Sequence, residues 1–77
     1  MSILEALHDR NLIISEILSG KDAKIRLNNM GLHINDKIVK LNNNKWGPIL
    51  IKNLSNNSIK IAIGRGLAEK IKVRYED

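Results

Sequence analysis

The two histidines are the first candidates for chemistry in this chain of 77 residues. A metal site or a nucleophile–base pair needs several ligating or titratable side chains at matched spacing. His8 and His33 stand far apart, the chain has no cysteine, and Asp36 is the nearest carboxylate to His33. We therefore expect no metal site, no cofactor and no catalytic constellation, so the protein is predicted not to be an enzyme.

The stretch Gly64-Arg65-Gly66 is the second candidate. Before a helical turn, it could present backbone amides and a guanidinium group to an anion. More often such glycines only redirect the chain, and we favour a structural turn formed by Gly64, Gly66 and Ala68. A Walker-type Lys-Ser/Thr motif does not occur in the sequence, so nucleotide is not expected as a ligand.

Trp46 has two interpretations that the sequence leaves open. Tryptophan is enriched at the energetic centres of protein interfaces, so Trp46 could be an exposed recognition residue. It could equally be a lid over the barrel.

The net charge of +5, from 13 Lys and Arg against 8 Asp and Glu, raises the question of a polyanionic partner. We favour scattered lysines at outward strand positions, namely Lys40, Lys52, Lys60, Lys70 and Lys72. Barrels that bind single-stranded nucleic acid need aromatic stacking platforms, and Trp46 and Tyr75 are the only aromatic residues. A small nucleic-acid-binding barrel remains the alternative function.

The length predicts a single domain over residues 1–77. No apolar run approaches the roughly 20 residues that cross a bilayer. The first residues include the acidic Glu5, where a signal peptide would carry a basic residue. We expect a cytoplasmic protein.

Alternating and β-branched residues predict a mainly β fold. The clearest case is Ile59, Ile61 and Ile63, which alternate with Lys60 and Ala62. Five short strands with frequent turns indicate a small, strongly bent barrel. The expected strands are residues 12–18, 37–41, 49–54, 59–63 and 71–75.

Two short helices and one further helical turn are expected. Residues 2–8 carry a capping box, in which Ser2 and Glu5 would bond each other's backbone amides. Residues 23–30 place Ala23, Leu27 and Met30 on one stripe, with Asp22 as the N-cap, and residues 67–70 can form one turn. Gly31 follows at the left-handed position that ends helices, and Leu32 can fold back on the stripe.

The strand at residues 37–41 has apolar residues on both faces, so the orientation of Lys40 is left open between a β-bulge and burial on two sides.

Four stretches together resemble the FeoA family, over nearly the whole chain from Leu4 to Val73. They are Arg26-Leu27-Asn28-Asn29-Met30-Gly31-Leu32, Asp36-Lys37-Ile38, Gly47-Pro48 and Ile61-Ala62-Ile63-Gly64-Arg65-Gly66-Leu67-Ala68. The chain departs from the family at Ile34-Asn35, where Pro-Gly is usual, and at Asp9-Arg10, where a glycine is usual. Asn35 can replace glycine in a left-handed position.

The resemblance implies an SH3-like five-stranded barrel with one short helix after the first strand and a short N-terminal helix. It implies an accessory protein of bacterial ferrous iron transport, which binds the cytosolic GTP-hydrolysing domain of the membrane iron permease (FeoB type) and could be recruited to the inner face of the membrane. Exposed strand edges could also support a weak homo-oligomer.

A groove between helix and barrel, lined by Leu27, Met30, Leu32 and Leu67, is a plausible place for a partner segment. Leu27 and Met30 are more simply explained as core, because an apolar stripe normally packs on its own sheet. The partner-binding residues proposed on this basis are Arg26, Leu27, Met30, Gly31, Leu32, Trp46, Arg65 and Leu67.

Overall fold

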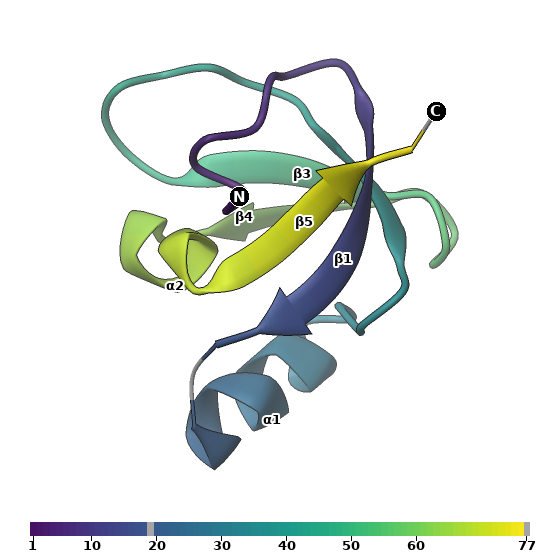
Figure 1. Cartoon of the computed structure of the whole chain (residues 1–77), viewed down its shortest axis with the longest axis vertical. Coiled ribbons are helices and arrows are strands. Elements are labelled where there is room, and N and C mark those ends of the chain that lie inside the picture. The colour runs from purple at the N-terminus through teal and green to yellow at the C-terminus, as the bar shows by residue number, and fades with distance from the viewer. Residues whose placement is uncertain (19, 77) are drawn as a thin grey trace.

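Five antiparallel strands form one strongly curved sheet in the computed structural model, which describes residues 1–18 and 20–76 (Figure 1). The order across the sheet is β4-β3-β2-β1-β5, so β4 and β5 lie at its two edges. The prediction of a mainly β fold with five strands is confirmed. The strands are β1 (Asn11–Ile17), β2 (Lys37–Lys40), β3 (Ile49–Asn53), β4 (Ile59–Ile63) and β5 (Ile71–Tyr75).

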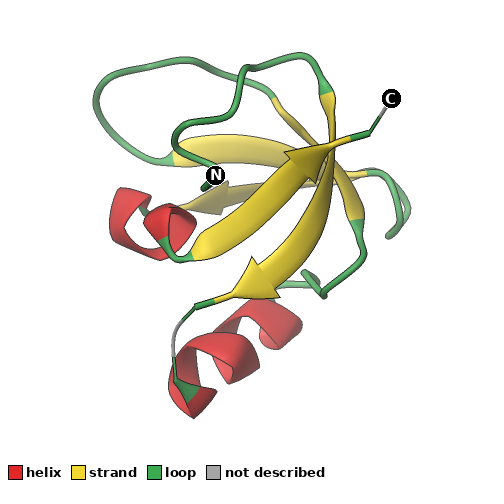
Figure 2. Cartoon of the chain, in the orientation of Figure 1, coloured by secondary structure: helices red, strands yellow, loops and turns green. Residues whose placement is uncertain are grey.

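Two short helices complete the small SH3-like barrel. Helix α1 (Lys21–Asn29) connects β1 to β2 and lies below the sheet, whereas α2 (Arg65–Glu69) connects the two edge strands, β4 and β5 (Figures 1 and 2). The inward side chains of the curved sheet pack with side chains of the two helices and the N-terminal segment in one hydrophobic core. The fully buried hydrophobic residues are Ile3, Leu12, Ile14, Leu27, Leu32, Ile38, Ile51, Ala68 and Ile71, with Ile49 and Ile63 at 1% exposure.

A bulge in β1 sets which of its side chains reach the core. The pairing of β1 with β5 shifts between Ile14 and Glu16, so Ser15 is the extra residue. Strict alternation after Leu12 and Ile14 would direct Glu16 inward. The extra residue instead leaves Glu16 exposed and buries Ile17.

The end of α1 has the predicted geometry. Gly31 has φ +89°, its N–H donates to the carbonyl of Asn28 at 3.0 Å, and the N–H of Leu32 donates to the carbonyl of Leu27 at 2.9 Å. This pair of bonds is the Schellman motif. The predicted N-cap is wrong, because α1 begins earlier and Gly20 takes the cap position. Asp22 lies instead in the first turn, where the helix dipole favours a carboxylate.

Two non-glycine residues occupy left-handed positions at the turns where the chain departs from the family pattern. Asn35 has φ +75°, as predicted, and Asp9 has φ +60° just before β1. Asparagine and aspartate tolerate this conformation best among residues with a side chain. Both turns are therefore kept without glycine.

The predicted helix over residues 2–8 is wrong, because this segment forms only a turn. One half of the capping box is present: the N–H of Ser2 donates to Oε1 of Glu5 at 2.8 Å. The helix does not propagate because the segment also pairs with β5. The N–H of Ile3 donates to the carbonyl of Ile71, and the N–H of Val73 donates to the carbonyl of Met1. As expected, the segment still docks on the barrel, with Ile3 and Ala6 buried.

The expectation that Lys40 points outward from its strand is wrong. It faces inward and is 2% exposed, and its Nζ donates to the carbonyls of Leu4 and Ala6, both at 3.0 Å. Burial, and secondarily the nearby charge of Arg65, lowers the pKa of Lys40 from its usual value of 10.5. The ammonium group thus binds two backbone carbonyls of the N-terminal segment, which is not helical. Neither a β-bulge in this strand nor burial of both of its faces is needed to explain the position of Lys40.

We expect Lys40→Ala to lower the free energy of unfolding by about 2 kcal/mol, because two carbonyls in a closed site lose their donor. Urea denaturation followed by circular dichroism measures this change. Lys45→Ala is the matched control, because Lys45 is exposed and its loss should change stability by less than about 0.5 kcal/mol. Equal stability of the two variants would contradict the assigned role of Lys40.

The carboxylate of Glu5 makes the N-terminal segment sensitive to acid. The hydrogen bond from the backbone N–H of Ser2 lowers the pKa of Glu5 below its usual value of 4.5. Because the pKa is lower in the folded state, the ionised carboxylate stabilises the folded protein at pH values above 4.5. This stabilisation is lost as the pH falls through the folded-state pKa.

The difference in unfolding free energy between the native chain and Glu5→Gln should therefore shrink as the pH falls from neutral to below 4.5. Glu16→Gln, at an exposed position of β1, controls for the general effect of removing a carboxylate. A difference that stays constant over this pH range would show that the Ser2–Glu5 bond does not form in solution.

Candidate partner-binding surface

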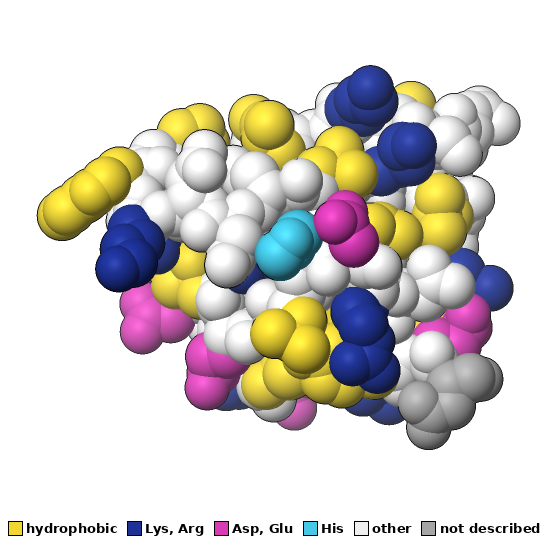
Figure 3. Space-filling view, turned by 90° about the horizontal axis from the view of Figure 1, so that it is seen from above, with side chains coloured by type: hydrophobic (Ala, Val, Ile, Leu, Met, Phe, Trp, Pro, Cys, Tyr) yellow, Lys and Arg dark blue, Asp and Glu magenta, His cyan; other side chains and the backbone are white. Residues whose placement is uncertain are grey.

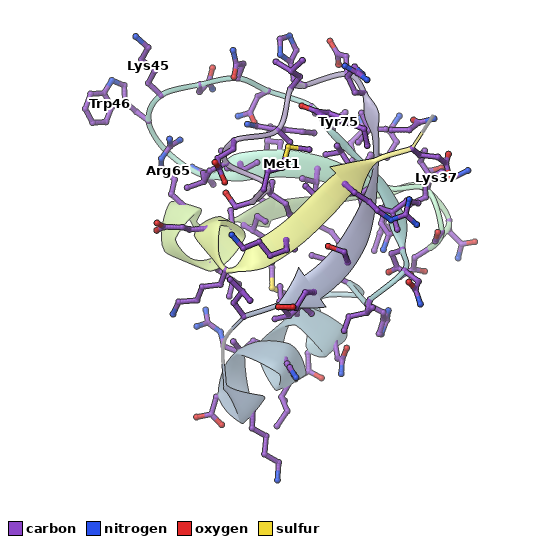
Figure 4. All side chains as sticks on the ribbon, viewed as in Figure 1. Met1, Lys37, Lys45, Trp46, Arg65 and Tyr75 are labelled. Carbon is purple, nitrogen blue, oxygen red and sulfur yellow. The ribbon has the colours of Figure 1, made fainter. Side chains whose placement is uncertain are left out.

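The exposure of Trp46 decides between the two interpretations that the sequence left open. Its side chain is 85% exposed, so it is not a lid over the barrel. It lies on the loop of residues 41–48 between β2 and β3, which we call the tryptophan loop. Trp46 and the neighbouring Lys45 point away from the body of the molecule (Figure 4).

The tryptophan loop is held in place near both of its ends. The side-chain amide of Asn42 accepts from the N–H of Leu50 at 3.1 Å through Oδ1, and donates to the carbonyl of Pro48 at 3.3 Å through Nδ2. Gly47 has φ +77°, a conformation that glycine adopts most readily. From the start of α2, Nη1 of Arg65 donates to the carbonyl of Asn44 at 3.0 Å. These contacts tie the loop to β3 and α2 on both sides of Trp46.

The corner at Gly64, Arg65 and Gly66 is a turn from β4 into α2, but its glycines are not required by conformation. Gly64 has φ −64°, positive φ occurs at neither glycine, and an added Cβ at either would meet no atom within 4 Å. The predicted reason for these glycines is therefore wrong. Ala68 is fully buried, so its small side chain belongs to the core.

The predicted groove between α1 and the barrel is not present in this structure. Leu27 and Leu32 are fully buried core residues, so neither is available to a partner. Met30 and Leu67 are half-buried and pack against the same core. Within residues 1–18 and 20–76 the surface encloses no pocket.

The remaining predicted partner-binding residues are divided between two ends of the molecule. Arg26 is exposed on α1, and Met30 and Gly31 lie at its end. Helix α1 lies at one end of the longest axis, whereas the tryptophan loop and Arg65 lie towards the other (Figures 1 and 4). The structure does not bring the two groups together, so we treat them as two candidate surfaces, and binding at either stays a prediction.

Gly31 has a structural role that the sequence only partly indicates. Besides its positive φ, a Cβ there would come within 2.8 Å of Nδ2 of Asn56. Its carbonyl accepts from Nδ2 of the fully buried Asn53 at 2.8 Å, and the same Nδ2 donates to Oδ2 of Asp36 at 2.8 Å. Asn53 thus joins the end of α1 to β3. The sequence signal for this role of Asn53 is a polar residue at an inward position of a predicted strand.

Each of the two histidines lies near one aspartate carboxylate. Nδ1 of His33 lies 3.4 Å from Oδ2 of Asp36, and Nε2 of His8 lies 3.7 Å from Oδ2 of the exposed Asp9. In the part of the chain that the structure describes, no three His, Asp or Glu side chains gather as metal ligands would. The expectation of no metal site stays a prediction.

On the face of the molecule seen from above (Figure 3), basic side chains do not gather in one stripe. The face seen in Figure 3 carries Lys and Arg in separate groups between hydrophobic and uncharged side chains. Lys37 forms an ion pair with Glu76 at 2.9 Å. No helix within the described residues is long and apolar enough to cross a membrane.

Comparison with known proteins identifies the family. The family model of the FeoA domain matches residues 1–75. The chain belongs to the FeoA family. A relative from Methanocaldococcus jannaschii, provisionally named Fe(2+) transport protein A, is 41% identical over 68 residues, which cover 88% of this chain and 78% of the relative.

Solved FeoA structures share the fold. A crystal structure described as iron uptake regulatory protein (FeoA) superposes with a TM-score of 0.87 at 32% identity, covering 99% of this chain and 97% of the other. The solution structure of iron(II) transport protein A from Clostridium thermocellum has a TM-score of 0.83 at 17% identity, covering 97% of this chain and 45% of the other. At that identity the likeness shows the fold alone.

The residues by which this FeoA chain resembles its family are largely structural. Leu27 and Leu32 fill the core, Gly31 ends α1, and Ala68 packs inside the barrel. Arg65 differs from these four, because its guanidinium group reaches out to the tryptophan loop.

We expect Trp46→Ala to change the free energy of unfolding by less than about 0.5 kcal/mol, because the side chain is mostly in solvent. Leu27→Ala should lower it by about 3 kcal/mol, because a buried side chain leaves a cavity. Urea denaturation measures both, with circular dichroism as the probe because Trp46 is the only tryptophan. A large loss from Trp46→Ala would mean that the loop folds back on the barrel in solution.

Proposed function

We propose that this protein is a cytoplasmic, non-enzymatic accessory protein of ferrous iron transport, which binds the cytosolic GTP-hydrolysing domain of a membrane iron permease of the FeoB type. Membership in the FeoA family, over residues 1–75, is the observation that carries this proposal. The names of two relatives support the link to iron: one is named for Fe(2+) transport, the other for regulation of iron uptake.

The tryptophan loop supports a role in binding. An exposed tryptophan can bury a large apolar area when a partner covers it, and such residues often dominate the binding energy of an interface. Asn42 and Arg65 hold the loop in shape, so little conformational freedom remains to be lost on binding. Lys45 beside Trp46 adds a positive charge that would favour an acidic partner surface.

In this proposal the protein carries neither iron nor nucleotide. Its effect on transport is exerted through contact with the domain that hydrolyses GTP, and recruitment to the inner face of the membrane follows from that contact. Trp46 enters a pocket of the partner, and Arg65 keeps the loop in the orientation that this requires.

We expect amide resonances of the tryptophan loop and of Arg65 to shift when isotope-labelled protein is titrated with the cytosolic domain of the cognate permease. Trp46→Ala should weaken binding about tenfold or more, as loss of a central interface residue does. Ile34→Ala is the matched control, because Ile34 is an exposed apolar residue on the turn after α1.

Two outcomes would contradict this assignment. Shifts confined to residues 26–32 would place the interface at the α1 end of the molecule instead. Absence of shifts with the permease domain, together with salt-dependent shifts on adding an oligonucleotide, would favour the nucleic-acid-binding alternative.

A further inference from the structure

The two edges of the sheet differ in how they are covered. At the β5 edge, the chain's own first residues add a short pairing: Ser2 bridges Lys72, and Val73 and Ile71 bond to Met1 and Ile3. At the other edge, β4 pairs with β3 alone. Within the described residues, β4 is therefore the edge that the chain leaves open.

The hydrogen bonds of β3 show which groups of β4 point outward. Leu50 uses its carbonyl for the N–H of Leu41 and its N–H for Asn42, so its backbone faces the β2 side. The neighbouring Ile51 must then face β4, where Ile61 is its partner. The N–H and C=O groups of Lys60 and Ala62 consequently point away from the sheet, and no backbone bond to them is present among the described residues.

Two lysines lie directly opposite each other beside this edge. Lys52 of β3 pairs with Lys60 of β4, at a position where the two backbones do not exchange hydrogen bonds. Side chains at such a position stand closest, with the Cα atoms about 4.5 Å apart. Neither lysine forms an ion pair with a carboxylate of the described residues. Like charges placed opposite each other destabilise a sheet, so this pair needs an explanation.

Protection of the edge does not explain both lysines. A lysine on an edge strand discourages indiscriminate strand pairing, which accounts for Lys60. Lys52 lies on the next strand inward, where no edge needs protection. An anionic group bound between the two ammonium groups would account for both.

The surroundings of the lysine pair allow another chain to approach. The outward positions that follow Lys60 are Ala62 and Gly64, both exposed, and Gly64 has no conformational need for glycine. Small residues at these positions leave room on the outer face for the side chains of an added strand. Leu50, opposite Ala62, is 43% exposed and offers an apolar contact beside the charges.

The geometry points to the β4 edge as a strand-addition site for an extended, acidic segment of a partner protein. The backbone groups of Lys60 and Ala62 pair with the incoming strand, and Lys52 and Lys60 bind its carboxylates, a mode of recognition in which main-chain bonds give affinity and side chains give specificity. This inference deepens the proposed function, since it rests on the protein acting by binding a partner.

Charge favours an acidic partner over a second copy of this chain. Pairing two β4 edges would bring Lys60 of one copy beside the lysines of the other, between molecules that each carry a net charge of +5. Such like-charge contacts disfavour association.

The test uses two probes, the cytosolic domain of the permease and a synthetic capped peptide in which glutamate alternates with valine. Each should slow hydrogen exchange at the amides of Lys60 and Ala62, whereas a peptide with lysine in place of glutamate should not. Binding should weaken about tenfold in Lys52→Glu/Lys60→Glu, which keeps two like charges opposite each other and so preserves the local repulsion.

A second variant tests the backbone pairing without changing charge. Ala62→Pro removes an N–H that no ladder bond uses, and proline is tolerated at an edge strand in that orientation. It should weaken binding of both probes about tenfold, whereas Ala62→Ser should bind as the native chain does.

The outcomes separate the inference from the proposed function. If the permease domain binds without protecting the Lys60 and Ala62 amides, the inference is wrong and the proposed function stands. If the permease domain does not bind at all and the acidic peptide alone protects them, the inference is supported and the proposed function fails. If neither probe protects them, or if protection rises with protein concentration alone, the acidic segment is not the occupant and the inference is overturned.

Discussion

The two hydrogen bonds from the buried ammonium group of Lys40 to Leu4 and Ala6 determine much of this structure. They hold the N-terminal segment against the barrel, where Ile3 and Ala6 complete the core. The same segment covers the edge of β5. A lysine at one inward strand position therefore helps to close the core and, together with the bonds to β5, to hold the segment that covers one edge of the sheet.

Elements with strong local patterns were predictable from the sequence. The alternation in residues 59–63 and 71–75 gave the bounds of β4 and β5 as observed, and Gly31 marked the end of α1. The N-terminal segment was not predictable in this way. Its capping box favours a helix, but tertiary pairing with β5 and the bonds from Lys40 provide more contacts than one isolated turn could. Local patterns do not contain these long-range terms.

The candidate site was predicted less well than the fold, for a physical reason. Residues that identify a family can be required for packing, for backbone conformation or for binding, and the sequence alone does not separate these requirements. Leu27, Leu32 and Ala68 satisfy packing, and Gly31 satisfies a left-handed turn. Exposure separates Trp46 from these residues, and exposure depends on how the loop leaves the barrel. The opposed pair of Lys52 and Lys60 likewise becomes visible only when the register of the strands is known.

The pairing of β1 with β5 also sets the order in which the chain can fold. Strands β2, β3 and β4 follow one another as neighbours, so they can pair as soon as they leave the ribosome. Strand β1 can pair with β2 at that stage, but its other edge must wait for β5. The N–H of Leu7 likewise finds its acceptor, Oη of Tyr75, 68 residues later. Such distant pairings are slow to form because a long loop has to close first. The start of the chain is therefore the last part to reach its final place, and until then the apolar residues of β1 depend on the remainder of the chain being synthesised.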